Sequence, residues 1–222
     1  MADPKPSRGA LDSDSRSKIV PTAELRRSLE YRIDIYQSQF FDSDIGRSYW
    51  MDRRLSERLA EELRIGYVSD AIAGDQWFAG CLAIPYLSSA GPVSIKFRAL
   101  DGQGQKYRYD KGQIHRIYNT LALQEAESIV ITEGEIDAAS FVQSGIPAVA
   151  LPGATSFKAA WRRIFFNRKV TVFCDGDDAG RKMGDALSSA LWGARIIEAP
   201  EGEDANSILV QHGPDRLREL VK

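Results

Sequence analysis

The sequence predicts an α/β protein in two parts, a small α+β part followed by a mostly parallel, Rossmann-like sheet flanked by helices. After about residue 124, short apolar runs of strand type alternate with helix-length segments, which is typical of successive βα units. Between about residues 77 and 109, short β-type runs are separated by turns instead, which indicates a small β-rich unit. We therefore expect a flexible tail at 1–21, an α+β part at 22–124 and the parallel sheet at 125–222.

The N-terminal elements follow from composition and spacing. Residues 1–21 are rich in Ser, Asp, Pro, Gly and charge, so they have too little apolar surface to order alone. From Thr22, a plausible N-cap, to about Ile45 the apolar residues recur at helical spacing, which predicts a helix. Two short helices are expected between residues 46 and 66, the second capped by Ser56 and ended by Gly66.

The remaining elements are read from the period of the apolar pattern. We expect strands at 77–85, 93–100 and 106–109 in the first part, and at 128–132, 147–151, 170–174 and 194–198 in the second. Helices are expected between the later strands, at about 136–145, 157–166 and 179–191. Right-handed crossovers between parallel strands bring their carboxyl ends to one edge of the sheet, where ligands bind.

Composition limits the classes of protein. The chain has 222 residues, 43% of them hydrophobic, and a formal net charge of −2, which suits a soluble protein with a sizeable core. No apolar run is long enough to span a membrane and the first residues lack a signal-peptide core, so we expect a cytoplasmic protein and no membrane contact. Cys81 and Cys174 are far apart and are expected to be buried free thiols. With only His115 and His212 beside them, no zinc site is expected, and His212 is better interpreted as a helix-end residue.

Two acidic clusters each follow a short apolar run. Residues 128–132 lead into Glu133-Gly134-Glu135-Ile136-Asp137, and residues 170–174 lead into Asp175-Gly176-Asp177-Asp178. Crowded carboxylates repel one another unless a cation neutralises them, and their hard oxygens suit Mg²⁺ or Mn²⁺. Asp137 and Asp178 also have a structural interpretation, because acids in a first helical turn stabilise the helix dipole. Either cluster alone is weak evidence for a metal site.

A local excess of positive charge contrasts with the net charge of the chain. Between Ile95 and Tyr118 there are six basic and two acidic residues, an excess of about +4. The basic residues are Lys96, Arg98, Lys106, Arg108, Lys111 and Arg116. They alternate with aromatic residues, a mixture that binds single-stranded nucleic acid. The alternative is a solvated surface strand whose aromatic side chains face the core.

Taken together, the two acidic segments resemble the TOPRIM domain, which is shared by DnaG-type primases, type IA and II topoisomerases and certain nucleases. The resemblance covers about Ser128 to Lys222, and Glu203-Asp204-Ala205-Asn206 stands where primases have a further acidic element. Upstream, residues 46–56 with 65–67 resemble the helical lead-in of DnaG-type primases, and 82–85 with 93–100 resemble their template-binding subdomain. The resemblance implies a primase catalytic core without the zinc-binding and helicase domains.

The resemblance also implies roles for residues. It implies DNA-templated synthesis of short RNA primers with two Mg²⁺ or Mn²⁺ ions and no zinc. Glu133, Asp175 and Asp177 would be catalytic, and the metal-binding set would be Glu133, Asp175, Asp177, Asp204 and Asp137. Glu133 is either a ligand or a general base, and Asn206 stands where cellular primases often carry an Asp, which puts the charge of the second metal site in doubt. The six basic residues listed above would hold template and incoming nucleotide.

Partners and rival functions follow from the same resemblance. The expected partners are a single-stranded DNA template, ribonucleoside triphosphates, a separate replicative helicase and a zinc-bearing polypeptide, in a bacterial or phage-infected cell. A TOPRIM nuclease would use the same acids, but it would leave the primase-like lead-in unexplained. A topoisomerase is disfavoured because the chain has no room for the domains that carry its tyrosine. A non-catalytic protein that binds single-stranded DNA is the alternative from a different class.

Overall fold

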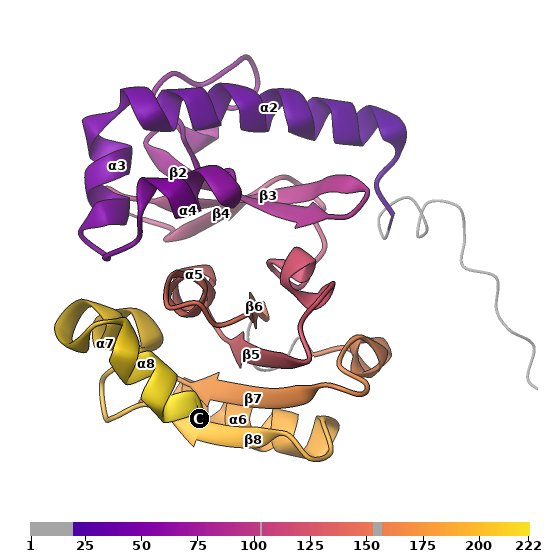
Figure 1. Cartoon of the computed structure of the whole chain (residues 1–222). Helices are drawn as coiled ribbons and strands as arrows, with labels where there is room; N and C mark the ends of the chain where they lie inside the picture. Colours follow the sequence, from indigo (N-terminus) through magenta and orange to yellow (C-terminus); the bar gives the residue numbers. More distant parts are fainter. Residues whose placement is uncertain (1–19, 103, 153–156) are drawn as a thin grey trace, which may run out of the picture.

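The computed structural model describes residues 20–102, 104–152 and 157–222 and contains two four-stranded sheets, one above the other in Figure 1. The first sheet is antiparallel with the order β1-β2-β3-β4. The second is parallel with the order β6-β5-β7-β8. This architecture confirms the predicted fold class. Of the predicted tail at 1–21, residues 1–19 lie outside the described residues.

Helix α2 (Ala23–Asp42) covers one face of the antiparallel sheet (Figure 1). Thr22 caps it as predicted, since its Oγ1 accepts the N–H of Leu25 at 3.1 Å. Leu29, Ile33 and Tyr36 are three or four residues apart, so they share one side of the helix, and all three are buried. They pack against the side chains of β2 and β3 that face α2, namely Cys81, Ala83, Ile95 and Phe97.

The two short helices predicted between residues 46 and 66 are α3 (Asp44–Met51) and α4 (Glu57–Glu62). Ser56 caps α4 as predicted, by accepting the N–H of Leu59 at 3.2 Å. The predicted stop at Gly66 is wrong, because α4 ends at Glu62 and Gly66 begins β1 (Gly66–Tyr67). A Cβ atom on Gly66 would lie 2.8 Å from the Cβ of Tyr36, so glycine allows this strand to pass close to α2.

The longer antiparallel strands are β2 (Cys81–Ser88), β3 (Gly91–Ala99) and β4 (Tyr107–Tyr109). The first begins later than the predicted 77–85, because Gln76–Phe78 form the 3₁₀ turn η1. Phe78 is thereby stacked on Phe97, with ring centroids 3.9 Å apart. Side chains alternate between the two faces of a strand. Phe97 faces α2, so its neighbours Lys96 and Arg98 face the parallel sheet.

The parallel sheet contains β5 (Ser128–Thr132), β6 (Ala148–Ala150), β7 (Lys169–Cys174) and β8 (Arg195–Glu198). Helix α5 (Glu135–Gln143) connects β5 to β6 and α6 (Asp178–Ala190) connects β7 to β8, as predicted. The predicted helix at 157–166 is wrong, because Ala159–Ile164 form the 3₁₀ helix η4. Lys158 provides no side-chain cap and no residue of η4 is buried, so an α-helix there would gain little from packing.

Two further helices, α7 (Ala205–His212) and α8 (Pro214–Val221), end the chain (Figure 1). His212 lies in the last turn of α7, in agreement with its interpretation as a helix-end residue. Cys81 and Cys174 are buried and free, as predicted. None of the described helices combines the length and apolar character needed to cross a bilayer.

One hydrophobic core contains side chains from both sheets. Leu82 and Ile84 of β2 belong to the same buried cluster as Val130 of β5 and Ile136 of α5. The expected boundary between residues 124 and 125 falls just after the 3₁₀ helix η2 (Thr120–Leu123), and the division into domains stays a prediction. The two sheets are thus packed on each other through an apolar contact, and the polar residues at its edge form the site described next.

Candidate active site between the two sheets

Two carboxylates leave neighbouring strands at the carboxyl edge of the parallel sheet. β5 and β7 are hydrogen-bonded neighbours, with Ile131 opposite Val172. Glu133 follows the end of β5 and Asp175 follows the end of β7. The topology therefore brings these two acids together, at the edge where open α/β sheets bind their ligands.

A second loop adds Asp204 to this edge. The N–H of Gly176 donates to the carbonyl of Glu203 at 2.8 Å, and the N–H of Gly202 donates to the carbonyl of Gly176 at 2.8 Å. A Cβ atom on Gly176 would collide with the carbonyl of Pro200, so only glycine allows the two loops to approach this closely. The loop after β7 and the loop before α7 are consequently joined, and Asp204 lies beside Asp175.

The acids line a polar cleft of about 360 Å³ between the two sheets. Acids from the parallel-sheet part meet basic side chains from the antiparallel sheet and from the segment after α3. The charged residues that line the cleft are Glu133, Asp137, Asp175, Asp204, Arg53, Lys96, Arg98 and Lys106. The cleft thus combines groups that can hold a cation with groups that can bind phosphate.

Three of the carboxylates in the cleft, those of Glu133, Asp137 and Asp175, have raised pKa values. The pKa of Asp175 is raised to about 7, chiefly by burial and then by the charges of Glu133 and Asp204. Burial, with a contribution from Asp177, also raises the pKa of Glu133. Asp137 is nearly inaccessible, and burial together with Asp204 and Asp175 holds its pKa well above the usual range. Without a cation, several of these acids are therefore poorly compensated.

Two carboxylate oxygens lack any partner. Glu133 Oε1 and Asp175 Oδ1 are buried, and no described residue donates a hydrogen bond to either. Burying an anion in this way is costly unless it is paired or coordinates a metal ion. Carboxylate oxygens are the ligands that Mg²⁺ and Mn²⁺ prefer, so the donor chemistry fits such an ion. Within residues 20–102, 104–152 and 157–222, no three His, Cys, Asp or Glu side chains already form a metal-binding group.

The side chains of Asp177 and Asp204 also cap helices. Asp177 caps α6, since its Oδ1 accepts the N–H of Gly180 at 2.8 Å, and its side chain is exposed and does not line the cleft. Asp204 caps α7 through a capping box with Ser207, whose N–H lies 2.6 Å from Asp204 Oδ1. Each cap uses Oδ1 and leaves Oδ2 without a hydrogen-bond donor among the described residues.

Asp137 and Asn206 connect α5 to α7. Asp137 Oδ1 accepts the backbone N–H of Asn206 at 3.1 Å. The side-chain amide of Asn206 donates to the carbonyl of Arg53 and to Ser140 Oγ, both at 3.0 Å. Asn206 therefore joins three separate segments at the base of the cleft.

Three of the six predicted basic residues line the cleft and three do not. Lys96 is buried and its Nζ lies 2.7 and 2.9 Å from the two carboxylate oxygens of Glu135. Arg98 donates to the hydroxyl of Tyr107 at 2.7 Å, and Lys106 is exposed. Because β4 alternates, Arg108 lies on the opposite face of the sheet, where it donates to the carbonyl of Trp77 at 2.6 Å.

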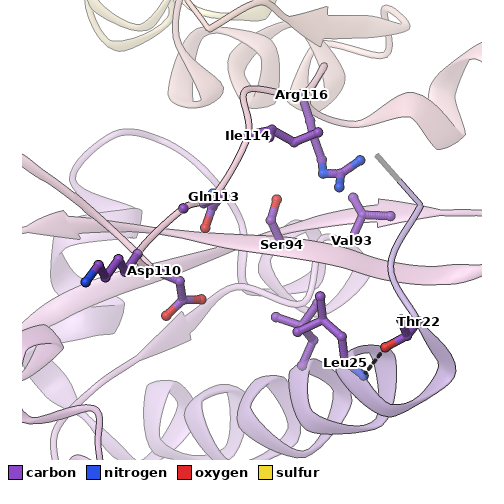
Figure 2. Close-up of a pocket in the computed structure, with 11 residues that line it drawn as sticks. Thr22, Leu25, Val93, Ser94, Asp110, Gln113, Ile114 and Arg116 are labelled. Atoms are coloured by element: carbon purple, nitrogen blue, oxygen red, sulfur yellow. Dashed lines mark hydrogen bonds between the residues drawn. The ribbon is translucent and has the colours of Figure 1, made fainter. Parts of the chain in front are cut away.

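Lys111 and Arg116 line a second cavity, of about 370 Å³, between the start of α2, β3 and the segment after β4. Figure 2 shows Arg116 and Asp110 at opposite sides of this cavity, with Ser94 and Gln113 between them. Asp110 is paired with Arg32, whose guanidinium donates hydrogen bonds to the two carboxylate oxygens of Asp110 at 2.8 and 3.1 Å. Lys111 and Arg116, two of the predicted nucleic-acid-binding residues, therefore do not line the cleft that contains the acids.

The structure adds residues to the cleft that the motifs did not indicate. Arg53 follows α3, and its guanidinium lies 3.6 Å from the ring centroid of Tyr49. Glu135 is the buried partner of Lys96 and also accepts a hydrogen bond from Tyr86. The contact of Glu135 with Lys96 has no sequence signal because the partners come from different parts of the chain, whereas Tyr49 and Arg53 are four residues apart, a spacing at which helical side chains meet. The sequence also could not have separated Arg108 from Lys96 and Arg98, because Arg108 lies on another strand and only the register, with Arg108 opposite Phe97, places it on the other face.

Comparison with known proteins agrees with this geometry. Residues 128–215 match the Toprim domain family. The chain is 40% identical over 151 residues to the Gene 57 protein of Mycobacterium phage D29, an alignment that covers 65% of this chain and 99% of that protein. It is 35% identical over 124 residues to the DNA primase of Pseudomonas aeruginosa, covering 51% of this chain but only 19% of that enzyme.

A solved structure shows the same fold over most of the chain. The DnaG primase catalytic domain bound to single-stranded DNA matches with a TM-score of 0.71 and 23% identity, covering 90% of this chain and 80% of that one. The sequence matches lead to one assignment. The chain belongs to the same family as the Gene 57 protein, carries a Toprim domain at residues 128–215 and is homologous to DnaG-type primases.

Proposed function

We propose that this chain is the catalytic core of a DNA primase, which synthesises short RNA primers on a single-stranded DNA template. The observation that carries the proposal is the pair of unpartnered, buried oxygens on Glu133 and Asp175, in a cleft also lined by Arg98 and Lys106. Nucleotidyl transfer needs carboxylates that hold divalent ions and cations that bind a triphosphate and a template backbone. Both requirements are met within one cleft.

The acids have distinct roles in this proposal. When bound, a pair of Mg²⁺ or Mn²⁺ ions lowers the pKa of the primer 3′-hydroxyl and neutralises charge on the triphosphate. Asp175, whose Oδ1 has no donor, would hold an ion, and Asp177 and Asp204 would offer the oxygens that their helix caps leave unused. Glu133 is a ligand or accepts the hydroxyl proton, a role that its raised pKa suits. Asp137, held by the N–H of Asn206, supports the loop that carries Asp204.

Different basic residues bind the triphosphate and the template in this proposal. Arg98, Lys106 and Arg53 share the cleft with the acids, so they bind the triphosphate. Lys96 is neutralised by Glu135 and acts by holding the two sheets together rather than by binding phosphate. Arg108, Lys111 and Arg116 lie farther from the acids and are candidates for the template backbone.

A primer-synthesis assay tests the proposal. The protein is incubated with single-stranded DNA, ribonucleotides and Mg²⁺ or Mn²⁺, and the products are separated by size. We expect short RNA from the wild type, none from Asp175→Asn, and wild-type yield from Asp178→Asn, which changes an exposed acid paired with Arg181. If the wild type makes no RNA even when a replicative helicase and a zinc-bearing partner are supplied, the primase proposal fails.

The same assay separates the rival functions. A Toprim nuclease would shorten the DNA in a reaction that requires Asp175. A non-catalytic protein would bind the DNA and change neither nucleic acid, and its binding would not depend on divalent ions. The proposed setting is the cytoplasm of a bacterial or phage-infected cell, where a separate helicase and a zinc-bearing polypeptide direct the enzyme to its initiation sites. Adding such a polypeptide should change the preferred initiation sequence.

A further inference from the structure

The end of the parallel sheet opposite the acids carries two exposed aromatic side chains. Trp192 is fully exposed and Phe166 is 76% exposed. Phe166 lies in the turn between η4 and β7, and Trp192 lies in the turn between α6 and β8. β7 and β8 are neighbouring strands, and both turns lie at the tail ends of their arrows in Figure 1, away from α7. Large aromatic side chains that cluster at the surface in this way indicate an interaction site.

The two turns enclose a cavity of about 440 Å³. Both exposed aromatic residues line it, and its apolar part is formed by Phe165, Val170 and Leu191. None of the described residues that line the cavity is acidic. The cavity therefore suits a flat apolar group attached to a negatively charged chain.

The segment that carries Phe166 is basic. Residues 157–170 contain five basic residues and no acid. Arg168 is used within the protein, because its guanidinium donates to the carbonyls of Leu123 and Ala126. Arg162, Arg163 and Lys169 are exposed, and no described carboxylate forms an ion pair with them. Arg162 lines the cavity together with the two rings, and Arg163 and Lys169 belong to the elements on either side of Phe166, so all three cations are available to an anionic ligand.

The turns define the backbone that carries the two rings. Asn167 follows Phe166 with a positive φ of 62°, and Gly193 follows Trp192 with a φ of 81°. Both backbones therefore reverse sharply after the aromatic residue. Arg168 bonds the first turn to the segment before β5, which limits its movement. A preformed surface loses less entropy on binding.

We propose that this end of the sheet binds single-stranded nucleic acid, with bases stacked on Trp192 and Phe166 and phosphates on Arg162, Arg163 and Lys169. Exposed rings alternating with cations are the combination that proteins use to bind single strands without sequence preference. This proposal depends on the proposed function, because primer synthesis is what brings a single strand to the protein. β7 has six residues, so at about 3.3 Å each the two sites lie about 20 Å apart. A strand of several nucleotides reaches from one site to the other.

Binding of labelled oligothymidylate to the full chain, followed by fluorescence anisotropy, tests the proposal. We compare the wild type with the double variant Phe166→Ala/Trp192→Ala. Tyr31→Ala serves as the matched control, because Tyr31 is an exposed ring on α2, 61% accessible. We expect the double variant to bind a long oligothymidylate about tenfold more weakly, since losing stacked bases has effects of this order. The control should bind as the wild type does.

A second measurement identifies the ligand class. Stacking of a base should quench the fluorescence of Trp192, so the total quenching should be smaller in Trp192→Phe, where any quenching of Trp77 remains. Polyglutamate at matched charge should not quench the fluorescence of Trp192. Equal quenching by polyglutamate would assign the surface to an acidic protein partner and overturn the proposal, as would equal affinities of the double variant and Tyr31→Ala. Failure of primer synthesis with quenching retained would reject the proposed function and leave this inference intact.

Discussion

Two glutamates that lie two residues apart have opposite environments. Glu135 is 2% exposed, yet both of its oxygens contact Lys96 and it also accepts a hydrogen bond from Tyr86. Glu133 lies in the cleft with a buried oxygen that no described residue contacts. The chain can therefore neutralise a buried carboxylate with its own side chains, and it does so at Glu135 but not at Glu133. The difference indicates that Glu133, unlike Glu135, is placed to receive a positive charge from outside the chain.

The largest effect should come from removing a negative charge in the cleft. Asp175→Asn keeps the shape of the side chain but weakens its ability to hold a divalent ion. We expect primer synthesis to fall about a thousandfold or more, which corresponds to roughly 4 kcal/mol in the activation free energy. The metal-free variant should melt at a higher temperature than the wild type, because a poorly compensated charge is lost. A lower melting temperature would contradict our account of the cleft.

Removing one charge from the Lys96–Glu135 pair should destabilise the protein, unlike the removal of a charge from Asp175. Lys96→Met leaves Glu135 buried without its cation, and we expect a loss of about 3 kcal/mol in the free energy of unfolding. Replacing both partners, in Lys96→Met/Glu135→Met, should recover part of that loss, because an apolar pair of similar volume can substitute for a buried ion pair, although the Tyr86 hydroxyl loses its acceptor. Chemical denaturation of the three proteins measures the effect. A double variant no more stable than Lys96→Met would mean that the pair is not an isolated unit.

Asn206 bonds Asp137 at the base of the cleft, and its substitution should have an effect of intermediate size on stability. Asn206→Asp cannot donate to the carbonyl of Arg53 or to Ser140 Oγ, and it adds a charge beside Asp137. We expect a loss of about 1–2 kcal/mol in the metal-free protein. Mg²⁺ should restore part of this loss if the added carboxylate contributes to an ion site. Melting curves with and without Mg²⁺ decide this, and an equal loss in both would exclude such a contribution.

Stability should depend on pH through the unpaired acids. The pKa of Asp175 is raised to about 7 in the folded state, above its value of about 4 in the unfolded chain. The folded state therefore binds this proton more tightly, and the resulting stabilisation is complete below about pH 4 and lost as the pH rises through about 7. In EDTA, the melting temperature should fall by a few degrees between about pH 5 and 8. The fall should be smaller in Asp175→Asn, and a flat wild-type profile would contradict the prediction.

The smallest effect on stability is expected at Asp177. Asn is as good an N-cap as Asp, so Asp177→Asn should change the free energy of unfolding by only a few tenths of a kcal/mol. Asp177→Ala should lose about 1 kcal/mol, because α6 loses its cap. Primer synthesis should fall in both variants if Asp177 binds an ion. Retained synthesis in Asp177→Asn would assign the residue to capping alone.

The sequence was sufficient for the elements whose cause is local. The spacing of Leu29, Ile33 and Tyr36 predicted α2, and the runs before Glu133 and Asp175 predicted β5 and β7. It was insufficient where the cause is a distant contact. Gly66 begins a strand where it passes close to Tyr36, and Ala159–Ile164 form a 3₁₀ helix that has no side-chain cap and whose residues are only partly buried.

The same distinction holds for the candidate site. The acids could be grouped from the sequence because parallel strands end at one edge of the sheet. Arg53, and the pairing of Lys96 with Glu135, depend on how two segments far apart in the chain pack together. A basic residue found in a favourable segment, such as Lys96, therefore could not be recognised as an internal counter-ion before the structure was known.

The buried cluster that joins Leu82 and Ile84 to Val130 and Ile136 has a consequence for substrate entry. The acids and the cations of the cleft are attached to two sheets that share this core, so their separation is set by side-chain packing. A nucleotide therefore enters a space of largely constant width. An enlarged or truncated side chain in the shared core, at Ile84 or Ile136, would change that width and alter nucleotide affinity without touching a single charged residue.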